Sequence, residues 1–196
     1  MSQEKSALLV KDVQPSIVQR IDNQDEYLKR VSQAVDYAHK NEIKVIYIVV
    51  GFRKGMPEIN LTNKSFSAIK ASSQDDALIN PMPMLSLTDN DILIQKKRVS
   101  AFSGSDLEMI LRSNGITNLV LCGIATSGVV LSTVREAADK DFKLSVLEDL
   151  CVDFDQQVHE LLISRVFPRQ AAVLNSSQWI SAGEGGNQPD KIEKAK

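Results

Sequence analysis

Residues 118–130 read Asn-Leu-Val-Leu-Cys-Gly-Ile-Ala-Thr-Ser-Gly-Val-Val, an apolar run followed at once by small and hydroxyl-bearing residues. The run at 118–123 has the length and the continuous aliphatic content of a strand that is buried on both faces. Residues 127–140 then follow a helical pattern. A buried strand that turns directly into a helix is the repeating unit of parallel sheets, so this stretch predicts an α/β fold.

The same alternation of short apolar runs and helical stripes continues along the chain in both directions from this stretch. Strands are expected at 7–10, 43–50, 92–95, 118–123, 143–148 and 171–174. Helices are expected at 25–41, 105–113, 127–140 and 155–166. This order predicts a three-layer α/β/α sandwich, Rossmann-like, around a six-stranded parallel sheet.

Two segments stand apart from the alternating pattern. Residues 51–90 show weaker periodicity, although 66–71 could form a short helix. An insertion of this length in a compact domain is typical of a lid or a binding segment. Residues 182–196 are rich in Gly, Pro and charge, without an apolar stripe. We therefore expect a single domain at 1–181 and a flexible tail at 182–196.

Composition narrows the class of partner. The chain has 196 residues and a net charge of −2, which predicts no binding to nucleic acid or to an anionic membrane and favours a small-molecule partner. Its two cysteines, Cys122 and Cys151, lie in apolar stretches and cannot form a disulfide framework, so a reducing, cytoplasmic location is expected. No apolar segment has the length of a membrane span or a secretory leader.

Ligands of open parallel sheets bind beyond the carboxyl ends of the strands, and two charged residues follow predicted strands there. Asp12 comes after the first strand, where apolar neighbours would raise the pKa of its carboxyl and suit it to general acid or base catalysis. Asp12 could equally cap a turn. Lys96 follows the strand at 92–95 and could orient a carboxylate, or belong to a solvated basic run at 96–98.

Two further places could bind an anion. The turn at 123–130 leads into a helix, whose first backbone N–H groups attract anions, although Thr126 and Ser127 could simply be N-cap residues. The Arg53 guanidinium could bind a substrate carboxylate through two parallel hydrogen bonds, or it could be an ordinary charged group on the surface. No metal site or other cofactor is expected, because His39 and His159, the only histidines, fall on predicted helices.

In this order and spacing, the motifs resemble those of the isochorismatase-like hydrolase superfamily, also called the cysteine hydrolase family. The segments that carry the resemblance are 7–14, Lys96 with 100–102 and 106–107, 123–126 with Thr133 and Ala137, and 147–149. The resemblance implies catalytic roles for Asp12 and Lys96. We expect their charged groups to lie within about 4 Å of each other, or to share one ligand, and to face Val129 across a pocket. The resemblance also implies a cis peptide at Ile124–Ala125, an oxyanion hole formed by the Ala125 and Val129 amides, and substrate contacts from Gln14, Arg53 and Phe102.

One departure from the family pattern bears on the chemistry. Val129 occupies the position of the nucleophilic cysteine of the amidase members, and valine cannot attack a carbonyl. Neither Cys122, which lies within a predicted strand, nor Cys151, placed past the fifth strand without a partnering base, is a good substitute. Ser127 has no expected histidine to activate its hydroxyl.

The departure leaves two functions open. True isochorismatases resemble this chain in lacking the cysteine, and they hydrolyse a vinyl ether by protonating its enol carbon. That chemistry implies Asp12 as the general acid and Lys96 as the residue that positions an anionic substrate, such as a carboxylate. The alternative is a non-catalytic ligand-binding or assembly protein. In either case, the resemblance implies a homodimer or homotetramer.

Overall fold

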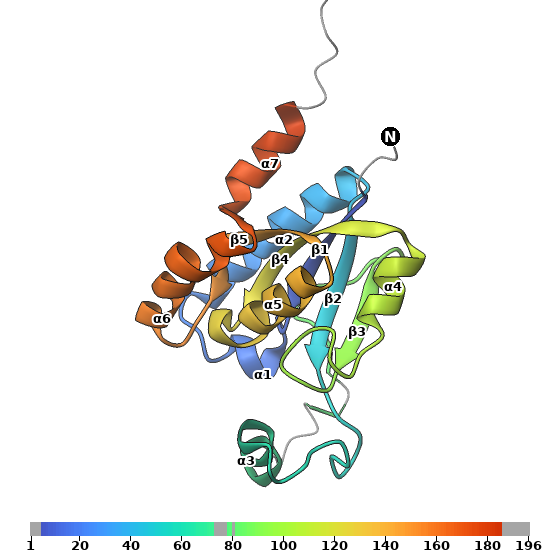
Figure 1. The fold of residues 1–196 in the computed structure, drawn as a ribbon, viewed down its shortest axis with the longest axis vertical. Coiled ribbons are helices and arrows are strands. Elements are labelled where there is room, and N and C mark those ends of the chain that lie inside the picture. Colours follow the sequence, from blue (N-terminus) through green and yellow to red (C-terminus); the bar gives the residue numbers. More distant parts are fainter. Residues whose placement is uncertain (1–4, 73–77, 80, 186–196) are drawn as a thin grey trace, which may run out of the picture.

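A computed structural model describes residues 5–72, 78–79 and 81–185 of the chain. At its centre is a six-stranded sheet in the order β3-β2-β1-β4-β5-β6, in which every pair of neighbours is parallel (Figure 1). The strands are β1 (Lys5–Lys11), β2 (Lys44–Val50), β3 (Ile92–Lys96), β4 (Ile116–Ile124), β5 (Lys143–Val152) and β6 (Ala172–Leu174). The predicted sandwich and its parallel sheet are confirmed.

Helices cover both faces of the sheet (Figure 1). One face packs against α2 (Gln24–Lys40) and α7 (Ser176–Gly185), which meet where Tyr37 contacts Trp179 edge to face. The other face carries α4, α5 and the segment that runs from α6 into η3. The remaining bounds are α1 (Pro15–Val18), α3 (Lys64–Ser72), α4 (Leu107–Ser113), η2 (Thr126–Val130), α5 (Leu131–Asp139), α6 (Gln156–Leu161), η3 (Leu162–Val166) and η4 (Phe167–Arg169).

The strand order places a topological switch point between the ends of β1 and β4. From β1 the chain crosses over towards β2 and β3, whereas from β4 it crosses in the opposite direction towards β5 and β6. In open parallel sheets, ligands bind where this direction changes, outside the carboxyl ends of the strands. Asp12 directly follows β1 and the turn at 123–130 lies at the end of β4, so both candidate segments lie at this switch point.

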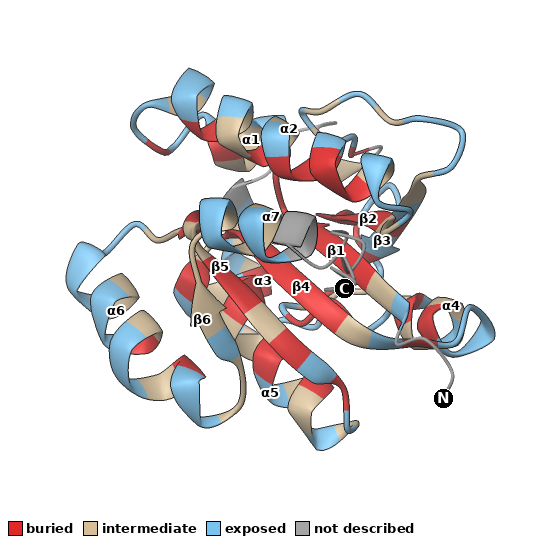
Figure 2. Ribbon diagram, turned by 90° about the horizontal axis from the view of Figure 1, so that it is seen from above, coloured by how far each residue is buried: buried red, intermediate tan, exposed pale blue. Residues whose placement is uncertain are grey.

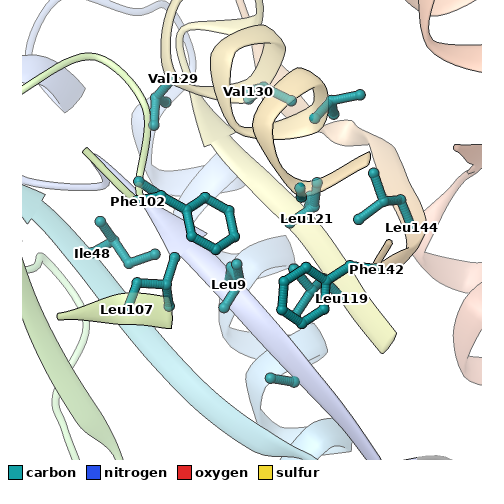
Figure 3. Packing of buried hydrophobic residues seen from close by; sticks show 14 of the residues in the cluster. Leu9, Ile48, Phe102, Leu107, Leu119, Leu121, Val129, Val130, Phe142 and Leu144 are labelled. Atoms are coloured by element: carbon teal, nitrogen blue, oxygen red, sulfur yellow. The ribbon is translucent and has the colours of Figure 1, made fainter. Parts of the chain in front are cut away.

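The two central strands carry apolar side chains on both faces, which explains their continuous hydrophobic sequences. Leu9 and Leu121 pack on the α5 side, in the larger core cluster, whose aromatic members include Phe102 and Phe142 (Figure 3). Leu8 belongs to the cluster on the α2 side. Burial is accordingly concentrated along the sheet and on the inner faces of its helices (Figure 2).

Several local predictions need correction. The helix expected at 127–140 begins as a π-helical turn, η2, and continues as α5 to Asp139, with a kink inside η2 at Gly128, whose backbone is non-helical at φ −96° and ψ −105°. Strand β5 continues beyond residue 148 to Val152, so Cys151 lies within it and not past it. The register between β4 and β5 shifts where Leu121 pairs with Val146 and Gly123 pairs with Cys151, which extends β5 past the predicted end.

The two segments outside the alternating pattern are only partly described. The short helix expected at 66–71 is present as α3. Within the insertion, Phe52 and Phe66 pack edge to face in a small core of their own. The expected tail begins inside α7, so residues 182–185 are helical, and residues 186–196 lie outside the described part of the chain. In the described ranges, no helix has the length and apolar character that crossing a membrane requires.

Gly123 permits the close approach of β4 to β1. Its φ is +138°, and a Cβ at this position would lie 2.1 Å from the carbonyl oxygen of Lys11. That contact is with backbone, which cannot rotate away as a flexible side chain could. The carboxyl end of β4 can therefore pair with β1 only if residue 123 has no side chain.

We predict that Gly123→Ala destabilises the protein by about 3 kcal/mol or more, because it adds a backbone clash to an unfavourable φ. Gly115→Ala is the matched control, since Gly115 also has a positive φ, +64°, but a Cβ at that position would meet no described atom within 4 Å. It should cost only about 1–2 kcal/mol. Urea unfolding measures both, and equal losses would contradict the role of the close approach.

Candidate active site

Asp12 and Lys96 form a buried ion pair at the carboxyl ends of β1 and β3. Lys96 Nζ lies 2.9 Å from Asp12 Oδ2, and the two side chains are 2% and 8% exposed. The expected separation of about 4 Å or less is therefore confirmed. Strand β2 lies between the two strands, and the Asp12 amide donates a 2.7 Å hydrogen bond to its Ile48 carbonyl. Asp12 itself adopts φ 57°, so the chain turns sharply as it leaves the sheet.

All three N–H groups of the Lys96 ammonium have acceptors. Besides Asp12 Oδ2, it donates to the carbonyl oxygens of Arg98 at 3.1 Å and Val99 at 3.0 Å. A lysine has three donors, so the three contacts account for all of them. In contrast, Asp12 Oδ1 is buried and has no hydrogen-bond partner among the described residues. Lys96 thus holds one oxygen of Asp12, and the other oxygen is available for chemistry.

Burial sets the protonation of Asp12. Desolvation raises the pKa of its carboxyl, whereas the charge and hydrogen bond of Lys96, and the charge of Lys11, act in the opposite direction. The net shift is upward. A carboxyl with a raised pKa retains its proton at higher pH than an exposed aspartate does, which is the property required of a general acid.

The turn after β4 has the expected cis peptide at Ile124–Ala125. The Ala125 carbonyl accepts hydrogen bonds from the Gly128 and Val130 amides, at 3.1 and 3.2 Å. Val129 is 2% exposed and packs in the larger core cluster, to which Phe102 also belongs (Figure 3). The pocket between Val129 and the ion pair, and the oxyanion hole of the Ala125 and Val129 amides, stay predictions.

The other predicted substrate-contact residues have structural partners of their own. Gln14 is buried, and its side-chain amide bonds the backbone of Val50 in both directions, at 3.2 and 2.9 Å. Phe102 packs in the core beside Phe142. Arg53 is 74% exposed and pairs with Glu58 at 2.6 Å. Their contacts with a substrate also stay predictions, and Gln14 clearly fixes the segment after Asp12 to the end of β2.

Sequence analysis missed a contact made by His159. Its Nδ1 lies 2.8 Å from the hydroxyl oxygen of Thr126, the first residue of η2. Asp153, in the loop before α6, accepts a 2.6 Å hydrogen bond from the Ser127 amide. The two hydrogen bonds connect the turn after β4 to the segment that follows β5. No motif spacing reveals the contact, because it depends on how α6 packs. Nowhere in the described ranges do three His, Cys, Asp or Glu side chains gather as metal ligands would.

Comparison with known proteins identifies the family to which the chain belongs. YwoC, an isochorismatase family protein of Bacillus subtilis strain 168, is 29% identical over 166 residues, which cover 85% of this chain and 87% of the relative. A probable isochorismatase of Pseudomonas chlororaphis is 28% identical over 181 residues, covering 90% and 86%. The solved structure of an isochorismatase family protein from Burkholderia thailandensis superposes with a TM-score of 0.75 at 23% identity, covering 92% and 96%. The isochorismatase domain model matches residues 6–178, and the chain therefore belongs to the isochorismatase family.

Proposed function

We propose that the protein is a cofactor-independent hydrolase that cleaves a small vinyl ether, or a related substrate, by acid catalysis from Asp12. The observation that carries the proposal is the asymmetry of the buried carboxyl group. One oxygen is bound to Lys96, and the other has no partner among the described residues. A similarity to a protein named as a probable isochorismatase supports this reaction class.

The reaction would proceed in three steps, which are protonation of the substrate, addition of water and breakdown of the resulting hemiketal. Asp12 Oδ1 gives its proton to the enol carbon, and the electron pair of the carbon–carbon double bond forms the new C–H bond. The positive charge that results is shared between the ether oxygen and its carbon, which then accepts a water molecule. The water loses a proton to the Asp12 carboxylate, which leaves a neutral hemiketal. The hemiketal then loses its hydroxyl proton to solvent and forms the carbonyl group as the bond to the ether oxygen breaks, and that oxygen takes up a proton from solvent and leaves as an alcohol.

Lys96 acts in this proposal chiefly through Asp12. The sequence suggested that Lys96 positions an anionic substrate, but its three donors already have acceptors in the structure. It holds Asp12 in one orientation and provides positive charge beside the carboxylate that forms when the proton leaves. That charge stabilises the conjugate base and thereby promotes proton transfer to the substrate.

Val129 argues against the acyl-enzyme route of the amidase type, since a valine side chain offers no nucleophile. Burial raises the pKa of the Cys151 thiol to about 12, and it raises that of Cys122 as well. Both thiols therefore remain protonated near neutral pH and are poor nucleophiles. Acid catalysis requires neither of them.

The competing function is a non-catalytic binding or assembly protein with the same fold. A buried ion pair loses much of its attraction to desolvation, so it is weak evidence for a stabilising role. Asp12 and Lys96 together are better explained by a working site than by stability. The enzyme is therefore the preferred interpretation, with binding alone as the outcome if no turnover is found.

The test of the proposal is Asp12→Asn. Wild-type protein should hydrolyse isochorismate, and the variant should lose at least about 10³-fold in kcat, because asparagine has no acidic proton to give. Activity of the wild type should also fall as pH rises through the raised pKa of Asp12. Exposed Asp22→Asn serves as the control and should leave the rate unchanged. Product formation measured by chromatography distinguishes these outcomes, and a fully active Asp12→Asn would exclude Asp12 as the acid.

Val129→Cys tests whether the site is a decayed amidase. If acid catalysis operates, the new thiol should add no amide hydrolysis, and isochorismate turnover should stay within about tenfold of wild type. A set of simple amides, including nicotinamide, provides the assay. Appearance of amidase activity, together with rapid alkylation of the thiol by iodoacetamide, would instead favour loss of an ancestral nucleophile.

We also propose that the protein assembles as a homodimer or homotetramer. Large apolar side chains are exposed on α4 and α6, at Met109 and Leu161, which are 64% and 57% exposed. Burial of such groups against a second copy would be favourable. Light scattering at micromolar concentration should give at least twice the 21.7 kDa chain mass, and the mass of a single chain would contradict the proposal.

A further inference from the structure

Lys11 is a second buried lysine at the carboxyl edge of the sheet, and the reaction proposed above gives it no role. It is the last residue of β1 and directly precedes Asp12. The residue is 0% exposed, and its Nζ has no hydrogen-bond partner among the described residues. Burying a charged ammonium without an acceptor is costly, so stability alone does not account for a lysine at this position.

The sheet register shows where the Lys11 side chain points. Lys11 pairs with Gly123 of β4, which in turn pairs with Cys151 of β5. Paired residues on neighbouring parallel strands project from the same face. Lys11 therefore lies on the face of the sheet that carries Cys151 and Leu9, both in the larger core cluster. Val129 belongs to this cluster as well, so Lys11 projects into the layer that contains the turn after β4.

Gly123 also leaves room for the stem of Lys11. A Cβ on Gly123 would lie 2.9 Å from the Cβ of Lys11, which is closer than the two side chains could approach. The absence of a side chain at Gly123 thus serves the lysine as well as the strand pairing. A long cationic side chain is therefore accommodated on β1, between β2 and β4, at a position where an aliphatic residue would be expected on a buried strand.

Within the described ranges, no anion is given over to balancing the charge of Lys11. The groups that act on it electrostatically are Cys151, Cys122, Asp12 and Lys96. The raised pKa values of the two thiols keep them uncharged near neutral pH. Asp12 is engaged by Lys96. Burial lowers the pKa of Lys11 to about 8, so it is mostly protonated at pH 7 and the cluster has an excess of positive charge.

The two lysines therefore differ in what they can bind. All three donors of Lys96 are occupied by Asp12, Arg98 and Val99, whereas those of Lys11 have no acceptor in the described part of the chain. We propose that Lys11, and not Lys96, binds the anionic oxygen group of the substrate, a small carboxylate. This inference rests on the proposed function for the location of the substrate, beside Asp12.

Benzoate and benzamide are suitable probes, because they have similar shapes and only benzoate is charged. Isothermal titration calorimetry should show that wild type binds benzoate more tightly at pH 7 than at pH 9 by about tenfold, as Lys11 loses its proton between the two. Benzamide binding should not depend on pH. Lys11→Met should weaken benzoate binding at least tenfold at pH 7 and abolish its pH dependence.

Three further variants make the test specific. Lys29→Met, at an exposed position of α2, should bind benzoate as wild type does. Asp12→Asn should keep the loss of affinity between pH 7 and 9, which shows that the titrating group is not Asp12. Lys11→Gln, which is polar but uncharged, provides the same comparison if Lys11→Met does not fold.

Thermal unfolding adds an independent readout. Because the pKa of Lys11 is lower in the folded protein than in a free lysine, its protonated form destabilises the fold below about pH 8. The Tm of wild type should thus gain a contribution from Lys11 as pH rises from 8 to 10. Lys11→Met should lack this contribution and have a higher Tm than wild type at pH 7.

Two results would overturn the inference. One is benzoate binding by Lys11→Met with the affinity and pH dependence of wild type. The other is a wild type that fails to bind benzoate at millimolar concentration or does not distinguish it from benzamide. Neither readout involves turnover, so loss of isochorismate hydrolysis with the benzoate results intact would reject the proposed reaction and keep the anion site.

Discussion

The contact between Asp12 and Lys96 connects β1 to β3 across the whole width of β2. Its burial depends on the segment after β3, which folds back over the lysine. The carbonyl oxygens of Arg98 and Val99 in this segment accept the remaining two hydrogen bonds of the Lys96 ammonium. The next residues are fixed to α5, where Ser100 donates to Glu136 and the Ala101 amide donates to Thr133. Helix α5 follows the turn after β4, so the ion pair and that turn are parts of one connected structure.

Burial has opposite effects on stability and on chemistry in this region. The removal of water raises the pKa of Asp12 and lowers that of Lys11, and both shifts reflect a free-energy cost of keeping charge inside the protein. The same desolvation strengthens every electrostatic interaction that a bound substrate would make. A hydrocarbon side chain would serve stability better at either position, which is why charged residues at the end of a buried strand indicate function.

Much of the fold could be predicted because its signals are local. A continuous apolar run predicts a doubly buried strand such as β4, and a helical stripe predicts α2, whatever the rest of the chain does. The errors occur where neighbouring strands override local preference. Strand β5 extends to Val152 because β4 offers partners to Cys151 and Val152, and the predicted helix after β4 is interrupted at Gly128.

The sequence by itself determined the α/β class, the positions of Asp12 and Lys96 at strand ends, and the absence of a nucleophile at Val129, since each depends on residue type and order along the chain. Only the tertiary structure decided which donors and acceptors are already used. It showed that Lys96 is saturated while Lys11 is not, and it joined Thr126 to His159. Hydrogen-bond saturation depends on distances of about 3 Å between atoms from different strands and loops, and such distances are set by packing, which residue spacing along a chain does not encode.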